Sequence, residues 1–307
     1  MSHIFCQQVQ LDELEAIKIE HPLFSATLLL QGAQLIEFTP TSTENNLLWL
    51  SDSVEYKQGK PLRGGIPICW PWFGNLDKNP PAIQSQIKDK SSASAHGFAR
   101  SMPWKIVSII ESCHQVEVIL ALTSDEQTKA LWPFEFNLEA RFIFSQQLEI
   151  ELKTVNNSET AFSFSQALHT YLPTEDIKKT YIHNAHNSYY IDAMDHWQEK
   201  PQIGRIGFSE ETDRLYFFPE QSGSNQFQLR VEAPNQQLLV NTENSRSAVI
   251  WNPWVKKSLG LSQFSPHDYQ NMLCIESANI LDDSVLLESQ QQHSLKLTLT
   301  SLGNFNN

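Results

Sequence analysis

The sequence predicts an all-β protein built as a large antiparallel β-sandwich. Apolar and polar residues alternate over long stretches, which is the two-residue period of strands with one buried face; the clearest are Val116–Leu122, Phe134–Phe144 and Leu148–Leu152. Helical patterns are few, and they are too short to serve as the crossovers of a parallel sheet; they fall at Gln127–Trp132 and Pro266–Asn271. The 307 residues, 40% of them hydrophobic and 19% charged, are enough to fill one large core.

We therefore expect a single domain that spans residues 1–307. No internal repeat is visible, and the segment Pro80–Ser94, rich in Pro, Lys, Asp and Ser, is expected to be an exposed loop rather than a linker. Further strands are expected where short apolar runs lie between turn-forming residues; these are Phe227–Val231, Leu238–Asn241, Val249–Trp251 and Leu295–Leu299.

The charge of the chain argues against two classes of partner. Its formal net charge is −13 and it has no run of Lys or Arg, so nucleic acid and anionic membranes are unfavourable partners. A small phosphate compound is still compatible with this charge, because a few arginines in a pocket act within a screening length of about 8 Å.

The four cysteines are widely separated and form no CxxC pair, so the sequence shows neither a structural zinc site nor a redox motif. Free thiols in a reducing cytoplasm fit this pattern. The N-terminus lacks a basic region followed by an apolar one, and no window approaches the roughly 18 apolar residues of a membrane span. We expect a cytoplasmic protein; the sequence does not determine its oligomeric state.

His169 is the first candidate catalytic residue. Within AFSFSQALHTYL the strand period places His169 on a face with Ser163, Ser165 and Ala167, whose small side chains leave room for a ligand. A hydrogen-bonded structural histidine is the alternative.

Glu276 is the second candidate. In NMLCIESAN it ends a strand among apolar neighbours, and partial burial would raise the pKa of this carboxyl and make it a stronger base. A solvated glutamate at a strand end is an equal alternative at this point.

Two arginines could bind phosphate. Arg63 precedes two glycines, and His96 and Arg100 flank Gly97 in AHGFAR. The planar guanidinium suits bidentate phosphate binding, so Arg63 and Arg100 together could clamp such a group, although arginines are also common at surfaces.

Tryptophans gather in PLRGGIPICWPWFG and VIWNPWVKK. These rigid apolar side chains could pack on a sugar ring or could instead close the ends of the sandwich core. The segment YIHNAHNSYYIDAMDH holds three histidines and two aspartates, but its spacing matches no metal signature, so no metal site is predicted.

Six short motifs give the chain a family resemblance. Taken in order, they closely resemble the glucose-6-phosphate 1-epimerase family within the aldose 1-epimerase superfamily, over about Gln31–Ile280; they are RGGIPICWPWFG, AHGFAR, ALHTYL, TDRLY, VIWNPW and CIESAN. The resemblance implies a galactose mutarotase-like sandwich and an isomerase that interconverts the α and β anomers of hexose 6-phosphates without metal or cofactor.

The resemblance also implies roles for individual residues. It places the acid/base pair on His169 and Glu276, sugar-binding groups on His96 and Asp213, and phosphate-binding groups on Arg63 and Arg100. Many relatives have Glu-Pro-Gly at the catalytic carboxylate, whereas this chain has Glu276-Ser277-Ala278, which looks more like the bacterial branch. Two other functions stay open: an epimerase for unphosphorylated aldoses and a non-catalytic sugar-phosphate-binding protein.

Overall fold

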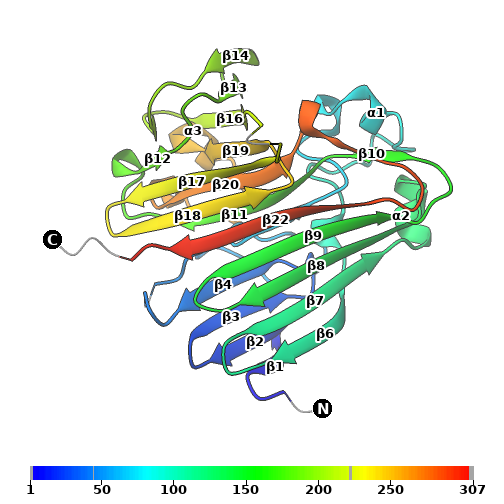
Figure 1. Ribbon diagram of the computed structural model, residues 1–307, viewed down its shortest axis with the longest axis horizontal. Helices are drawn as coiled ribbons and strands as arrows, with labels where there is room; N and C mark the ends of the chain where they lie inside the picture. The colour runs from blue at the N-terminus through cyan, green and yellow to red at the C-terminus, as the bar shows by residue number, and fades with distance from the viewer. Residues whose placement is uncertain (1–2, 44, 221–222, 304–307) are drawn as a thin grey trace.

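The computed structural model describes residues 3–43, 45–220 and 223–303, and it confirms the all-β prediction. Its larger sheet has nine antiparallel strands (Figure 1); their order is β15 (Ile206–Gly207), β12 (Tyr181–His183), β17 (Gln226–Ala233), β18 (Gln236–Glu243), β22 (Gln292–Ser301), β9 (Leu148–Asn156), β8 (Phe136–Phe144), β7 (Val116–Thr123) and β6 (Lys105–Glu111).

A second sheet of seven strands carries three of the six candidate site residues, His169, Asp213 and Glu276. Its order is β14 (Gln198–Pro201), β13 (Tyr189–Asp192), β16 (Thr212–Phe217), β19 (Ser247–Asn252), β20 (Met272–Asn279), β11 (Gln166–Pro173) and β5 (Ile68–Cys69). The N-terminal strands form a four-stranded sheet, in the order β1 (Cys6–Leu11), β2 (Leu14–His21), β3 (Phe24–Leu29) and β4 (Leu35–Pro40), and a two-stranded sheet pairs β10 (Phe162–Phe164) with β21 (Val285–Leu287).

Helices are short and lie in the connections. The α-helices are α1 (Pro81–Gln84), α2 (Glu126–Leu131) and α3 (Trp254–Ser258), and the 3₁₀ turns are η1 (Leu76–Lys78), η2 (Ala99–Ser101), η3 (Ile177–Lys179), η4 (Asp268–Gln270) and η5 (Leu281–Asp283). Within the described ranges, no helix is long and apolar enough to cross a bilayer.

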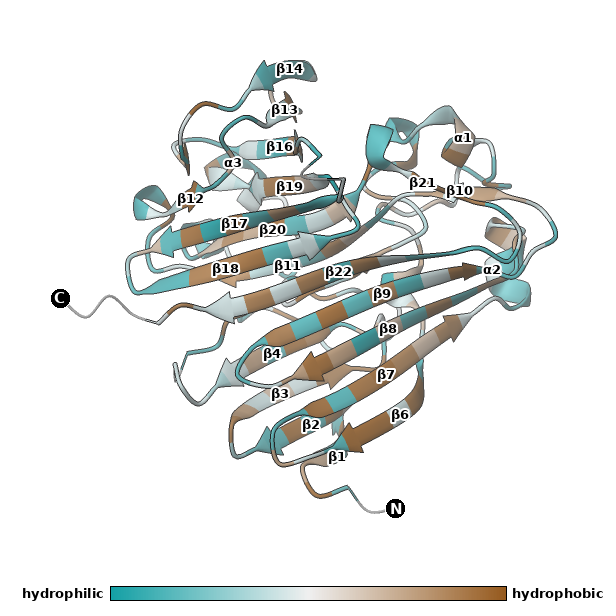
Figure 2. Cartoon of the chain, viewed as in Figure 1, coloured by the Kyte–Doolittle hydropathy of each residue, from teal (hydrophilic) through white to brown (hydrophobic). Residues whose placement is uncertain are grey.

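The alternation seen in the sequence is the reason for the sandwich. Along β8 and β9 every second residue is buried and the residues between are partly exposed, and Figure 2 shows the same bands of apolar and polar residues on these strands. Side chains from the nine-, seven- and four-stranded sheets join one buried cluster. This shared core is the basis for our proposal that residues 1–307 form a single domain.

A second, smaller apolar cluster lies on the other face of the seven-stranded sheet. Along β20, Leu273 and Ile275 belong to the main core, whereas Met272 and Cys274 belong to this second cluster. Because side chains alternate along a strand, Glu276 shares the face of Cys274. The main core therefore supports the sheet from behind and leaves this face for a site.

One detail differs from the sequence predictions, and one open alternative is decided. The segment Pro80–Ser94 is not a plain exposed loop, since it contains helix α1 and buries Ile83 and Ile87 in the main core. The tryptophans of PLRGGIPICWPWFG are structural. Trp70 and Trp72 are fully buried and pack with a core phenylalanine, Phe98. Their rings cannot contact a ligand.

Candidate active site

His169 and Glu276 face each other across two neighbouring strands. They are direct partners in the antiparallel register of β11 and β20, and the Nε2 atom of His169 lies 3.3 Å from Oε1 of Glu276. Both side chains are nearly inaccessible, at 8% and 2% exposure. The structure thus brings together the two residues that the sequence predicted as an acid/base pair.

Burial sets the protonation of this pair. It raises the pKa of Glu276 well above its usual range, and the nearby Asp213 carboxylate adds to the effect. For His169, burial followed by the charges of Arg100 and Arg63 lowers the pKa to about 3. When the pair holds one proton, that proton therefore resides on the carboxyl group and faces a neutral imidazole.

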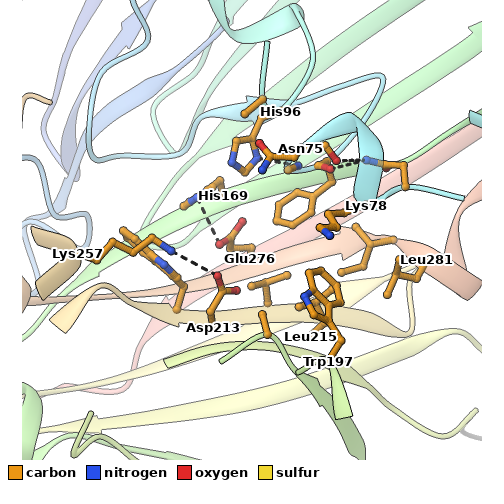
Figure 3. A pocket seen from close by; sticks show the side chains of 18 of the residues that line it. Asn75, Lys78, His96, His169, Trp197, Asp213, Leu215, Lys257, Glu276 and Leu281 are labelled. Atoms are coloured by element: carbon orange, nitrogen blue, oxygen red, sulfur yellow. Dashed lines mark hydrogen bonds and ion pairs between the residues drawn. The ribbon is translucent and has the colours of Figure 1, made fainter. Parts of the chain in front are cut away.

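The pair opens into a cavity of about 380 Å³, a size suited to a small ligand. Figure 3 shows side chains converging on it from both sides of Glu276. The polar and charged residues that line it are Arg63, Asn75, Lys78, Asn79, His96, His169, Asp213, Lys257 and Glu276, and among the apolar ones are Phe73, Trp197, Leu215 and Trp251.

His96 is held by a tight turn in which both His96 and Gly97 have positive φ angles. A Cβ atom at position 97 would lie 2.0 Å from the Trp70 carbonyl oxygen, so the glycine admits the neighbouring backbone rather than a ligand. The Gly74 N–H donates to Nδ1 of His96. Since burial also lowers the pKa of His96 well below its usual range, the ring is neutral and Nε2 carries the remaining N–H.

Asp213 lies on β16, opposite Trp251 of β19, and lines the same cavity. Its Oδ2 atom is 3.7 Å from the ammonium group of Lys257, which also lies 3.4 Å from Glu211. Burial raises the pKa of Asp213, although Lys257 opposes this. The carboxyl group is therefore an acceptor placed beside Glu276.

The two predicted phosphate ligands lie on the His169 side of the site. Arg100 belongs to η2 and lines an adjoining cavity of about 540 Å³, and Arg63 and His169 line both cavities. One Arg100 nitrogen donates to the Ala95 carbonyl oxygen, and Arg63 donates to that of Ser262. In the described part of the chain neither guanidinium forms an ion pair with a carboxylate, so their charges are available to an anion.

Three cavity residues were missed by sequence reasoning. Trp197, in the turn between β13 and β14, is 40% exposed and lines the cavity, and the Lys78 ammonium lies 5.5 Å from its ring centroid. Trp197 directly follows the segment YIHNAHNSYYIDAMDH, which was considered only for metal ligands, and Lys257 ends the second tryptophan-containing segment, VIWNPWVKK. An aromatic residue in a polar turn was the available signal.

One histidine and both aspartates of YIHNAHNSYYIDAMDH form ion pairs with different residues. His183 lies 2.9 Å from Glu232, and Asp192 and Asp195 both contact Lys200. Their side chains therefore contact different neighbours rather than converging on one point.

This fold and this site define a class of protein, the sugar 1-epimerases. Residues 15–300 match the aldose 1-epimerase family, and the chain belongs to that family. Among its relatives, a protein of Escherichia coli K12 named "Putative glucose-6-phosphate 1-epimerase" is 32% identical over 92% of this chain and 90% of the relative. One from Salmonella typhimurium with the same name is 32% identical over 87% and 84%.

Solved structures agree with this assignment. A Salmonella typhimurium crystal structure described as a "putative mutarotase" superimposes with a TM-score of 0.85 at 29% identity, covering 98% of this chain and 95% of the other. Galactose 1-epimerase from Lactobacillus acidophilus, at 13% identity, shares the fold with a TM-score of 0.67 over 96% and 97%. The predicted galactose mutarotase-like sandwich is thus confirmed.

Proposed function

We propose that this chain is a hexose-6-phosphate 1-epimerase, with glucose 6-phosphate as a substrate. The observation that carries the proposal is the buried His169–Glu276 pair beside a second cavity that His169 shares with Arg63 and Arg100, neither of which forms an ion pair within the described residues. The names of the relatives support the same substrate class.

The arginines orient the sugar. In a hexopyranose 6-phosphate, C6 and the ring oxygen O5 are both attached to C5. A phosphate bound by Arg63 and Arg100 therefore brings O5 toward His169, which lines both cavities, and leaves the O1 hydroxyl for Glu276. The geometry favours His169 as the acid for O5 and Glu276 as the base for O1.

The pair needs only one proton to complete the reaction. Glu276 takes the proton of O1–H while His169 donates its N–H to O5, so that the C1–O5 bond breaks and an aldehyde forms at C1. After rotation about C1–C2, neutral His169 takes the proton back as O5 attacks C1, and Glu276 returns a proton to O1. Acid/base catalysis of this kind contributes about 10²–10⁴-fold.

The phosphate also favours the reactive form of the pair. The charges of Arg100 and Arg63 help to keep His169 neutral in the empty site. A phosphate dianion bound between them offsets these charges and shifts the shared proton from Glu276 toward His169. Substrate binding would then create the acid that opens the ring.

Other cavity residues complete the binding site. We assign His96 Nε2–H to the region of the ring oxygen and Asp213 to a sugar hydroxyl, because both line the cavity beside the pair. Trp197 offers a ring face to the sugar C–H groups. This mechanism uses only side chains of the chain.

All four cysteines are free thiols, which supports a cytoplasmic location.

The test is anomer exchange by two-dimensional exchange NMR at low buffer concentration, with glucose 6-phosphate, galactose 6-phosphate and free glucose. Exchange accelerated for the phosphosugars above free glucose supports the proposal. Equal acceleration of free glucose would point to an aldose epimerase, and binding without acceleration would point to a sugar-phosphate-binding protein.

A further inference from the structure

Cys274 is a fully buried thiol that lies close to His169 and Glu276 but lines neither cavity. Cys274 and Glu276 are two residues apart on β20, so their side chains leave the same face of the sheet toward His169 of β11. A ring nitrogen of His169, the Cys274 sulfur and a Glu276 oxygen all lie within 4.8 Å of one another, and all three residues are buried. Among the described residues, this is the group of His, Cys, Asp or Glu side chains close enough to share one ion.

One carboxyl atom of this group, Oε2 of Glu276, is buried and lacks a hydrogen-bond partner among the described residues. Buried polar atoms without a partner are uncommon and need an explanation. The imidazole is neutral and has a lone pair to offer, while burial keeps the Cys274 thiol protonated by raising its pKa well above the usual range.

We propose that His169, Cys274 and Glu276 form a binding site for a thiophilic divalent cation such as Zn²⁺ or Co²⁺, which blocks the active site. Nitrogen, sulfur and oxygen ligands of these residue types are those that Zn²⁺ prefers. Bond lengths of about 2.0–2.3 Å place tetrahedral ligand atoms about 3.3–3.6 Å apart. The Nε2 atom of His169 and Oε1 of Glu276 already have this spacing, at 3.3 Å, so only the Cys274 sulfur must move closer.

Charge and cavity shape define the ion further. Cation binding releases the protons of the Cys274 thiol and the Glu276 carboxyl, and the resulting thiolate and carboxylate neutralise the two positive charges of the ion. Affinity therefore rises with pH. Mg²⁺ and Ca²⁺ prefer six or more oxygen ligands and are not expected to bind. The cavity above the pair leaves a fourth position open to water.

Inhibition by the cation rests on the proposed function of the pair. A bound cation occupies the lone pairs that must accept protons from the sugar, so the acid/base pair no longer functions. A hexose 6-phosphate and the cation compete for the same two residues, and each protects against the other.

The binding test uses tag-free, full-length protein titrated with Co²⁺ in the presence of a phosphine reductant. A thiolate ligand produces a near-ultraviolet charge-transfer band that carboxylates and imidazoles do not give. We expect this band in the wild type and in Cys113→Ser, which removes an exposed thiol, but not in Cys274→Ser or Cys274→Ala. A band retained in the Cys274 variants, or lost in Cys113→Ser, overturns the site.

The inhibition test compares the same variants in the exchange assay. Loss of a direct ligand costs at least as much as loss of an outer-shell partner, about 10–100-fold in metal affinity. Cys274→Ser and Cys274→Ala should keep the basal exchange rate and require at least that much more Zn²⁺ for half inhibition. Equal Zn²⁺ sensitivity in the wild type and both variants contradicts the site. If the protein accelerates no exchange but shows the Cys274-dependent band, the proposed function fails and the cation site stands.

Discussion

His169 and Glu276 are direct cross-strand partners on β11 and β20, with 3.3 Å between imidazole nitrogen and carboxyl oxygen. Their separation is therefore fixed by the backbone register of two central strands rather than by loops. Main-core residues on the opposite face of β20, such as Leu273 and Ile275, anchor the strand behind the pair. This explains how a strongly desolvated pair is kept in contact without any further partner.

The pH dependence of catalysis follows from this desolvation. The pair works while it holds one proton. Burial lowers the pKa of His169 to about 3 and raises that of Glu276, so the one-proton form prevails over the wide range between these two pKa values. We expect kcat to be flat across this range, to fall in acid as the pair gains a second proton, and to fall in alkali as it loses its last. The measurement is the anomer exchange rate from pH 4 to 9. A steep rise of this rate through about pH 6.5 would contradict the expected flat profile.

The arginines should contribute mainly to phosphosugar recognition. Arg63→Ala or Arg100→Ala removes a charged hydrogen bond, so we expect a loss of about 10–100-fold in kcat/KM for glucose 6-phosphate and little change for free glucose. Lys60→Gln is a matched control, because Lys60 lines the same second cavity but already faces Glu55. An equal loss for both sugars would exclude a phosphate role.

Free phosphite dianion gives a second measurement of the same subsite. If the anion shifts the shared proton to His169, phosphite should accelerate exchange of unphosphorylated glucose in the wild type but not in Arg63→Ala. No acceleration at a phosphite concentration that saturates binding would show that the arginines only bind the phosphate.

Trp197 should act in substrate binding through its ring face. Trp197→Ala removes a contact of the kind that contributes about 0.5–1.5 kcal/mol, so we expect KM to rise about 3–10-fold with little change in kcat, and Trp197→Phe to restore most of the affinity. The thermal midpoint should stay near that of the wild type, because the residue is 40% exposed in a turn. A kcat effect in both variants would contradict a stacking role.

Stability should also reflect the pair. The unfolded chain protonates His169 below about pH 6.5, whereas the folded protein does not until about pH 3, so stability falls as pH falls through this window. We expect His169→Gln to lose less thermal stability than the wild type between pH 7 and pH 4. His293 is a matched comparison, since burial lowers its pKa to about 4 outside the site. An unchanged slope in His169→Gln would show that this histidine is already protonated in the folded protein.

Strand period alone singled out His169 and Glu276 as candidates, and the family resemblance assigned roles to them and to the other four site residues. His169 and Glu276 were identified because alternate residues on a strand share a face. Two such residues on adjacent strands become neighbours only when the strands pair in the right register. The register itself, with His169 opposite Glu276, depends on how β11 and β20 pair across more than a hundred residues of chain. No local pattern encodes that pairing, which is why the distance between them could not be predicted.

Residues on loops and turns were harder to predict. Trp197 reaches the cavity from a hairpin turn and Lys78 from a 3₁₀ turn distant in sequence, so their proximity is a product of tertiary packing. For Trp70 and Trp72 the sequence left sugar packing and core packing open, and the structure buries both in the core. Composition indicates which side chains can bind a sugar, but not which side of the sheet they reach.

The most direct test of the proposed mechanism is the anomer exchange rate of glucose 6-phosphate in the wild type and in Glu276→Gln, after subtraction of buffer catalysis. Glu37→Gln is a matched control, because Glu37 lies on β4 and hydrogen-bonds to Thr27 outside both cavities. The acid/base account predicts a fall of about 10²–10⁴-fold in Glu276→Gln alone, with phosphosugar binding retained. Unchanged exchange in a folded, substrate-binding Glu276→Gln protein would contradict it.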